Sequence, residues 1–252
     1  MLNRITFKSD LVMKNIFSFV IFLFIIADVY AQNVNIYQTG ITAQQNLNAI
    51  ANLAPYSTGG IGFDTRYEGV VGSPRLFGTL LTSYLLVNDK DFYIKLETDI
   101  DLAGNAVLYT DPETKKLFAL PADNVNELII VKEDKEMIFK TTKGLKFEKN
   151  LKETKFYQVL AAGPVSFIKI PDKLFVEADY KGAYSADRRF DEYQDITKYF
   201  ITGSGNIFHQ IQLNRKSLIK LFPDKKELIN KTLQKKASDN NEELVISLIE
   251  KF

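Results

Sequence analysis

Carboxylates and one imidazole are the side chains of this chain that could do acid–base chemistry. His209 is the only histidine, and the 252 residues contain no cysteine. Thiol catalysis, thiolate metal sites and histidine-rich metal sites are therefore excluded, because each needs side chains of these types. A Ser–His–Asp triad would have to use His209, which no G-x-S-x-G sequence accompanies. His209 shares a predicted strand face with Ile207 and Ile211, so we expect a packed, hydrogen-bonded imidazole.

Two acidic pairs remain as candidates for catalysis. Asp99 and Asp101 lie on the polar side of a predicted strand, and Asp191 and Glu192 are neighbours in a later polar segment. Paired carboxylates are the machinery of glycoside hydrolysis, which keeps a glycan hydrolase open as an alternative. Adjacent residues such as the second pair point to opposite sides of a strand. We therefore predict no catalytic residues from either pair.

The first acidic pair also resembles the opening of a calcium-binding loop, since Gly104 follows Asp99 and Asp101 at a similar spacing. Calcium needs several oxygen ligands, including a bidentate glutamate late in the loop. Ala103 and Thr110 occupy two of those positions. A solvated acidic strand face explains the pattern better, so we predict no metal site and no cofactor.

The polar segment between residues 177 and 195 is the candidate binding region. Tyrosine and arginine are frequent binding hot spots, because they combine a large contact area with polar tips. A long loop is also a common place for binding residues. The predicted binding residues are Tyr180, Tyr184, Arg188, Arg189 and Tyr193.

The elements that must position these residues are mostly strands. From Asp91 to Thr110, apolar and polar residues alternate and then turn at Gly104, which predicts a hairpin with one buried and one solvated face. Short apolar runs separated by polar turns continue to residue 213 without any helical segment between them. They predict strands at 80–87, 117–120, 128–131, 137–139, 156–160, 165–170, 174–176, 199–202 and 207–213. Such neighbours pair antiparallel.

The pattern changes to helices after residue 213. Asn214 is a helix cap, Pro223 suits the first turn of the next helix, and the last helix has an apolar stripe from Leu244 to Phe252. The predicted fold is α+β: a mainly antiparallel sheet, as a sandwich or partial barrel, with C-terminal helices packed on it. Its parts are a Gly/Asn-rich segment at 32–78, a β domain at 79–213 and a helical segment at 214–252.

The N-terminus indicates export. A short basic start leads into an apolar run and then to small residues before Ala31, as in a signal peptide over 1–31, with Met13 as an alternative start. The run is shorter than the roughly 20 residues that a spanning helix needs. We predict cleavage near Ala31, a periplasmic or secreted location, and no transmembrane span in the mature protein.

Charge says little about partners. The formal net charge is +1, from 32 basic and 31 acidic residues, which gives no overall field to attract nucleic acid. Residues 215–236 are locally basic, with eight Lys or Arg against two acidic residues. An anionic lipid surface or an acidic partner could bind there, but amphipathic helices usually carry such charges on their solvated side.

The sequence EGVVGSPRLF at 68–77, with its G-x-x-G-S-P-x-L-F motif, is followed by the β-rich middle and the basic tail. In these features the chain resembles a group of uncharacterised exported bacterial proteins. The resemblance implies export and supplies no activity or functional residues.

The predicted function is that of an exported, non-enzymatic binding or scaffolding protein of the bacterial envelope. An envelope protein or a glycan is the partner class, and the oligomeric state is not predicted. Two alternatives stay open beside it. One is the carboxylate-dependent glycan hydrolase, and the other is a carrier of a lipophilic ligand, with a cavity between a curled sheet and the C-terminal helices.

Overall fold

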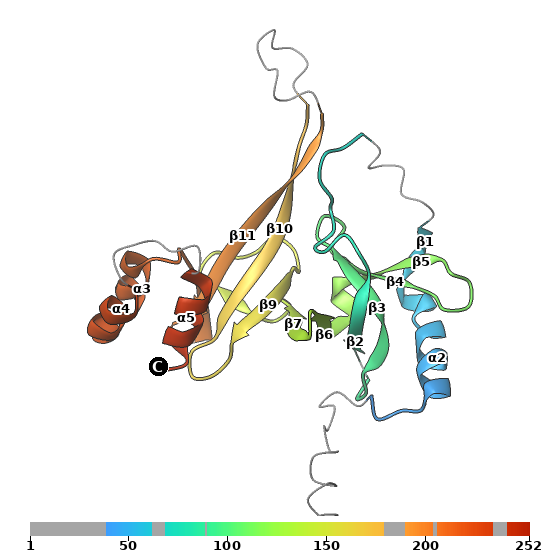
Figure 1. The fold of residues 1–252 in the computed structure, drawn as a ribbon, viewed down its shortest axis with the longest axis horizontal. Helices are drawn as coiled ribbons and strands as arrows, with labels where there is room; N and C mark the ends of the chain where they lie inside the picture. Colours follow the sequence, from blue (N-terminus) through green and yellow to red (C-terminus); the bar gives the residue numbers. More distant parts are fainter. Residues whose placement is uncertain (1–38, 62–68, 89, 179–189, 204–205, 234–240) are drawn as a thin grey trace, which may run out of the picture. The chain divides into compact units, whose positions relative to one another are not determined.

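The structure is a computed structural model that describes residues 39–61, 69–88, 90–178, 190–203, 206–233 and 241–252. The predicted signal peptide lies outside these residues. The described part confirms the α+β fold, with one large, mainly antiparallel sheet and helices packed alongside it (Figure 1). None of the helices in this part of the chain has the length and apolar character needed to cross a membrane.

Twelve strands form the sheet, in the order β1-β5-β4-β3-β2-β6-β7-β9-β10-β11-β12-β8. Their bounds are β1 Thr58–Ile61, β2 Leu81–Val87, β3 Ile94–Asp101, β4 Ala106–Thr110, β5 Leu117–Pro121, β6 Val125–Lys132, β7 Lys135–Thr141, β8 Lys146–Phe147, β9 Phe156–Ala161, β10 Phe167–Val176, β11 Glu192–Thr202 and β12 Ile207–Ile211. All neighbours pair antiparallel except β12 and β8, which pair parallel. The outermost strands β1 and β8 do not pair with each other, so the sheet is open.

A tight turn joins β6 to β7, as the alternating pattern predicts. The β6–β7 hairpin turns on Glu133 and Asp134, whose φ angles are 51° and 59°. Positive φ at both central residues is typical of a type I′ turn, whose twist matches that of the flanking strands. The register then runs from Lys132 opposite Lys135 to Glu127 opposite Lys140. The turn thereby fixes which side chains of β6 and β7 share a face.

The helices begin where their caps are. α2 spans Ala43–Ala51 and starts with a capping box between Thr42 and Gln45. α3 (Arg215–Leu221) starts at Asn214, whose side chain accepts from the Ser217 N–H, as predicted. The remaining helical elements are α4 (Lys226–Thr232), α5 (Asn241–Ile249) and the 3-10 turns η1 (Ala54–Tyr56), η3 (Ala122–Asn124) and η5 (Pro223–Lys225).

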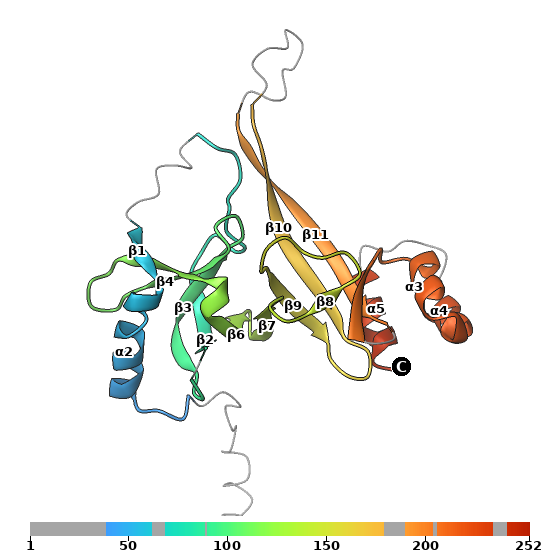
Figure 2. The same cartoon turned by 180° about the vertical axis from the view of Figure 1, so that it is seen from behind.

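The inner parts of strands β9 to β12 have packed segments on both faces (Figures 1 and 2). Phe167, Ile201 and Ile211 pack with apolar side chains of α3, α4 and α5. Their chain neighbours Ile168 and Phe200 point to the other face and pack with Phe147 of β8. Strand alternation therefore places the helices on one side of this part of the sheet and the segment that carries β8 on the other.

Helix α5 is held to the sheet by a polar cluster around Glu242. The Tyr199 hydroxyl donates a 2.6 Å hydrogen bond to Glu242, and the Lys169 ammonium lies 3.0 Å from the same oxygen. Burial raises the pKa of the Tyr199 phenol, and the acceptor Glu242 raises it further. Because the two donors come from β11 and β10, this carboxylate fixes α5 across both strands.

Two strands of the prediction were wrong in their limits. Strand β10 runs unbroken through Pro171, where a break was expected, and β11 begins at Glu192, inside the predicted loop. Strand β9 pairs with β10 only from Phe167 to Lys169, so β10 has no second neighbouring strand at Pro171. A proline is tolerated where its missing N–H removes no ladder hydrogen bond. Two other strands, β1 and the parallel β8, were not predicted.

The acidic face of β3 is another correction. Lys95 and Glu97 are exposed as expected, but Asp99 is fully buried and Asp101 is only 8% exposed. The chain at 74–77 lies over this end of the strand, with Leu76 N–H bonded to Ile100 O and Leu102 N–H bonded to Pro74 O. The alternation identified the face that points away from the main core. It could not show that a distant segment covers half of that face.

The Asp99 carboxylate is only partly satisfied. Its Oδ1 accepts from the N–H groups of Phe77 and Ile100, at 3.1 and 2.7 Å. Its buried Oδ2 has no hydrogen-bond partner among the described residues. Burial raises the pKa of Asp99, and the backbone N–H groups of Phe77, Ile100 and Gly78 together with the positive charge of Arg75 oppose that rise. The charged form of Asp99 is therefore disfavoured in the folded state.

The raised pKa of Asp99 predicts a specific pH dependence of stability. The folded state holds the proton more tightly than the unfolded state, so the contribution of Asp99 is complete below pH 3.8 and is lost as pH rises through the folded pKa. Asp99→Asn removes this term. We expect urea denaturation between pH 4 and 8 to show a free energy of unfolding that rises for the variant relative to the natural chain, by about 1.4 kcal/mol per unit of pKa elevation.

The exposed Asp123 supplies the control, because Asp123→Asn removes one negative charge from the surface. The difference in free energy of unfolding between Asp123→Asn and the natural chain should not rise with pH as it does for Asp99→Asn. Parallel pH profiles for the natural chain and Asp99→Asn would contradict the assignment.

Candidate functional site

The outer parts of β10 and β11 form a two-stranded arm, defined as residues 170–176 and 192–198. The two strands pair without interruption from Phe167 opposite Ile201 to Val176 opposite Glu192. Strand β9 covers β10 only through Lys169, and β12 covers β11 only from Tyr199. The arm therefore continues past its neighbours by roughly 20 Å, at about 3.3 Å per residue. Figures 1 and 2 both show it extending beyond the other strands.

A two-stranded ribbon is marginally stable in water, so further contacts must hold the arm. One is the backbone of Val71, which forms a parallel bridge to Glu192. The Val71 N–H donates to Asp191 O at 2.7 Å, and the Tyr193 N–H donates to Val71 O at 2.9 Å. Since the chain at 74–77 also bonds to the end of β3, the segment at 69–78 connects the arm to β3.

Glycine is required next to this bridge. Gly72 has φ +83°, and a Cβ placed there would lie 2.7 Å from the carbonyl oxygen of Tyr193. Only a residue without a side chain allows both the left-handed backbone and this close approach. The G-x-x-G-S-P-x-L-F motif therefore has a structural role, which is to bring the 69–78 segment against β11.

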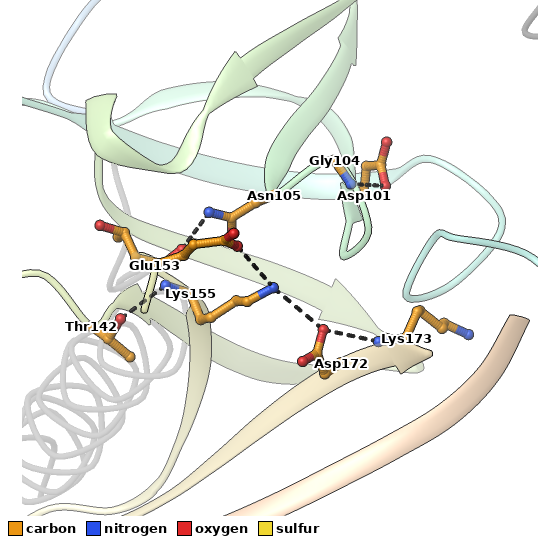
Figure 3. A network of polar contacts seen from close by, with 9 residues as sticks. Asp101, Gly104, Asn105, Thr142, Glu153, Lys155, Asp172 and Lys173 are labelled. Carbon is orange, nitrogen blue, oxygen red and sulfur yellow. Dashed lines mark hydrogen bonds and ion pairs between the residues drawn. The ribbon is translucent and has the colours of Figure 1, made fainter. Parts of the chain in front are cut away.

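A polar network around Lys155 holds the other strand of the arm (Figure 3). The Lys155 ammonium lies 3.5 Å from Asp172 of β10 and 3.6 Å from Glu153. Its backbone is paired with Thr142, whose N–H donates to Lys155 O at 2.9 Å. Asn105, in the β3–β4 turn, donates through its side-chain amide to the Thr154 carbonyl. The network thus links the base of the arm to the β3–β4 hairpin.

The inner and outer parts of the arm differ in character. Pro171 and the ion pair between Lys173 and Asp195, at 2.6 Å, occupy the inner part. Proline and charge at a free strand edge disfavour unspecific strand pairing. Farther out, Phe175 packs its ring against Tyr193, with ring centroids 5.1 Å apart.

Large exposed apolar side chains gather at the outer part. The described residues expose six of them, and four lie here as the arm patch: Val71 (50% exposed), Leu174 (48%), Phe175 (42%) and Phe190 (62%). Single exposed apolar residues are ordinary, whereas a group of them marks an interaction surface. The other two, Leu47 and Tyr56, lie on and just after α2.

Of the five predicted binding residues, only Tyr193 lies among the described residues. Tyr193 lies on β11 and contacts Phe175 of the arm patch. Tyr180, Tyr184, Arg188 and Arg189 lie outside the described residues. Sequence reasoning did not identify the apolar members of the patch, because Leu174 and Phe175 were assigned to a short strand of an ordinary sheet. The signal that could have found them is a strand without alternating polar residues beside a polar loop.

The acidic pairs are engaged in structural contacts. Asp99 is enclosed by backbone donors, and Asp101 Oδ1 accepts from the Gly104 N–H at 2.8 Å in the turn shown in Figure 3. Asp191 Oδ1 accepts from the Ala178 N–H at 2.8 Å, and Glu192 from the Gln194 amide at 3.1 Å. None of these four residues lines the grooves beside α2, on the β8 face of the sheet, at Asn214 or beside residues 148–151.

His209 is hydrogen-bonded, as predicted. Its Nδ1 lies 3.1 Å from Glu148 Oε2, and its ring also lies against Gly203, where an added Cβ would approach it to 2.9 Å.

Among the described residues, no group of three or more His, Cys, Asp or Glu side chains could hold a metal ion. No family model, curated protein or solved structure matches the chain.

The contact at Gly72 predicts a difference between two glycines of the same segment. Gly72→Ala combines left-handed backbone strain with a clash against Tyr193 O, and should lower the free energy of unfolding by about 2 kcal/mol or more. Gly69 has φ +82° but nothing within 4 Å of an added Cβ. Gly69→Ala should therefore cost only the strain, about 1 kcal/mol.

Urea denaturation measures both losses, and amide hydrogen exchange locates them. The Tyr193 N–H, which donates to Val71 O, should exchange faster in Gly72→Ala than in Gly69→Ala. Equal losses and equal exchange rates in the two variants would refute this role of Gly72.

Proposed function

We propose that this chain is an exported, non-enzymatic binding or scaffolding protein of the bacterial envelope, and that it binds a partner protein through the outer part of the arm. The observation that carries the proposal is the arm patch, which holds four of the six large exposed apolar residues of the described chain: Leu174 and Phe175 lie on the ribbon, Phe190 just before β11, and Val71 on the segment bonded to β11. A patch of this kind gains free energy when a partner covers it.

The arm also offers backbone groups to a partner. Outside the bridge to Val71, residues 192–198 of β11 have no second neighbouring strand among the described residues, and neither do residues 170–176 of β10. An extended partner segment can add to such an edge through main-chain hydrogen bonds, while side-chain pockets and apolar contacts supply specificity. A protein partner uses both the edge and the apolar side chains, whereas a glycan would use neither fully.

Exposed aromatic residues provide a matched pair for the test. A photoreactive phenylalanine analogue in place of Phe190 should give a discrete protein adduct when intact envelopes are irradiated. The same analogue in place of Tyr56, which is 59% exposed and lies away from the arm, should give none. The adduct identifies the partner by mass spectrometry, and the purified partner is then titrated by calorimetry.

In that titration, Phe190→Ser should weaken binding at least ten-fold, in the range expected of an aromatic hot spot. Tyr56→Ser should bind as the natural chain does, and both variants should keep their melting temperature. The proposal fails if the two positions give the same adducts, or if Phe190→Ser binds the identified partner with unchanged affinity.

The polar residues predicted from the sequence have a separate test. Tyr184→Ala combined with Arg189→Ala should weaken binding of the same partner, because Tyr and Arg contribute disproportionately to interface energies. Calorimetry with unchanged affinity would remove both residues from the binding site and leave the arm patch to stand alone.

A further inference from the structure

A groove of about 750 Å³ lies on the face of the sheet opposite the C-terminal helices. Strands β7, β9, β10 and β12 contribute its floor, and the segment at 144–146, which leads into β8, forms one side. This size is within the range of small-molecule sites. The groove is separate from the arm patch, none of whose residues lines it.

A polar row crosses one end of the groove. Glu127 of β6, Lys140 of β7 and Tyr157 of β9 stand directly opposite one another in the strand register. The Lys140 ammonium lies 2.8 Å from Glu127 Oε2, and Glu127 Oε1 accepts from the Tyr93 hydroxyl at 2.5 Å. The hydrogen bond to Glu127 raises the pKa of Lys140, so this lysine is charged at neutral pH.

Tyr157 carries a hydroxyl donor that no described residue accepts from. Tyr157 is 8% exposed, and burial raises the pKa of its phenol, so the hydroxyl keeps its proton at neutral pH. Within the described residues this hydroxyl makes no hydrogen bond, although its electrostatic neighbours are Lys140 and Glu127. A largely buried donor that faces a groove is satisfied by water or by a ligand acceptor.

An apolar row lies beside the polar one. Val159 and Ile168 stand opposite each other on β9 and β10, and Ile138, Leu145 and Phe208 complete the apolar lining. Residues two positions apart on a strand point to the same face. Ile138 therefore lies beside Lys140 on β7, and Val159 lies beside Tyr157 on β9. The groove therefore presents a strip of branched aliphatic surface that begins at a polar end.

The charges of the lining residues favour a single negative charge. Glu127 and Lys140 neutralise each other, and Lys146, which is exposed at the side of the groove and forms no ion pair with a described residue, adds one positive charge. A carboxylate supplies one charge and can accept from Tyr157 and Lys140 together. A doubly charged phosphate would carry more negative charge than the single net positive charge of the lining. A cationic head group would be repelled by Lys140 and Lys146.

We propose that this groove binds an amphipathic monocarboxylate of the fatty-acid type. The aliphatic chain lies on Ile138, Val159 and Ile168. The carboxylate accepts from the Tyr157 hydroxyl and the Lys140 ammonium, with Lys146 adding attraction at longer range. This site is independent of partner binding by the arm.

Decanoate, used below its micellar concentration, is the probe for calorimetry on the purified protein. The natural chain should bind it at one saturable site, and should bind decyltrimethylammonium, which has the same chain with a cationic head, at least ten-fold more weakly. Methyl NMR should show shifts on adding decanoate at Ile138, Val159 and Ile168. These measurements need no variant.

Two pairs of variants separate the head-group contacts. Tyr157→Phe removes only the hydroxyl and should raise the Kd about five-fold, as the loss of one hydrogen bond does, while Tyr56→Phe should change nothing. Lys146→Glu should raise the Kd at least ten-fold, with a dependence on salt. The matched control is Lys152→Glu, which reverses an exposed lysine in the same connection outside the groove.

Several results would overturn the proposal. They are the absence of saturable decanoate binding, NMR shifts confined to the smaller groove beside α2 around Leu53 and Ile94, and unchanged affinity in both Tyr157→Phe and Lys146→Glu. Equal affinity for decyltrimethylammonium would overturn the assignment of the carboxylate.

Discussion

The backbone pairing of Val71 with Asp191 and Tyr193 is the interaction on which the outer half of the structure depends. Ten consecutive register pairs hold β10 to β11, yet only the first three have a further strand beside β10. A ribbon of that kind has little apolar burial of its own, so its direction relative to the sheet must be set by contacts along its sides. Val71 supplies one side and Lys155 the other. Through them, the arm behaves as part of the sheet rather than as a loose hairpin.

The same segment explains the buried carboxylate. To reach β11, the chain at 69–78 must pass over the end of β3, and Asp99 lies beneath it. Fixing the arm and enclosing Asp99 are therefore one structural event. An unpaired buried carboxylate oxygen costs free energy. The hydrogen bonds that the backbones of Val71, Leu76 and Phe77 form along the same path offset that cost.

Local patterns predicted the fold well where neighbours in sequence are neighbours in space. The hairpin at Glu133, the cap at Asn214 and the alternation of Ile94 and Leu96 need only short-range information. The errors have long-range causes. Pro171 is acceptable because β9 ends early, Asp99 is buried because a segment more than twenty residues away covers it, and β8 pairs with a strand sixty residues later. The arm patch was missed for a related reason, since the exposure of Phe175 depends on where β9 and β12 stop.

Alternation gives the two faces of strands β9 to β12 different environments. Phe167 and its companions pack against helices, and Ile168 and its companions meet the short β8 and the segment before it. Helices fill their side with a continuous apolar stripe, whereas a two-residue strand cannot cover a sheet face completely. The lipophilic carrier hypothesis placed its cavity under the helices; apolar side chains of α3, α4 and α5 pack on that face, and the groove of about 750 Å³ lies on the opposite face, beside β8.

The position of β8 has a consequence for the order in which the chain acquires its structure. From β2 to β6, each strand except β5 pairs with the next one in sequence, so these contacts close over short stretches of chain. Strand β8, made early, finds its partner β12 only after residue 207 exists. Closing a connection of that length is entropically slow. Until β11 and β12 are in place, the ring of Phe147 lacks its partners Phe200 and Phe208, so this aromatic side chain stays partly uncovered while the earlier hairpins can already have formed.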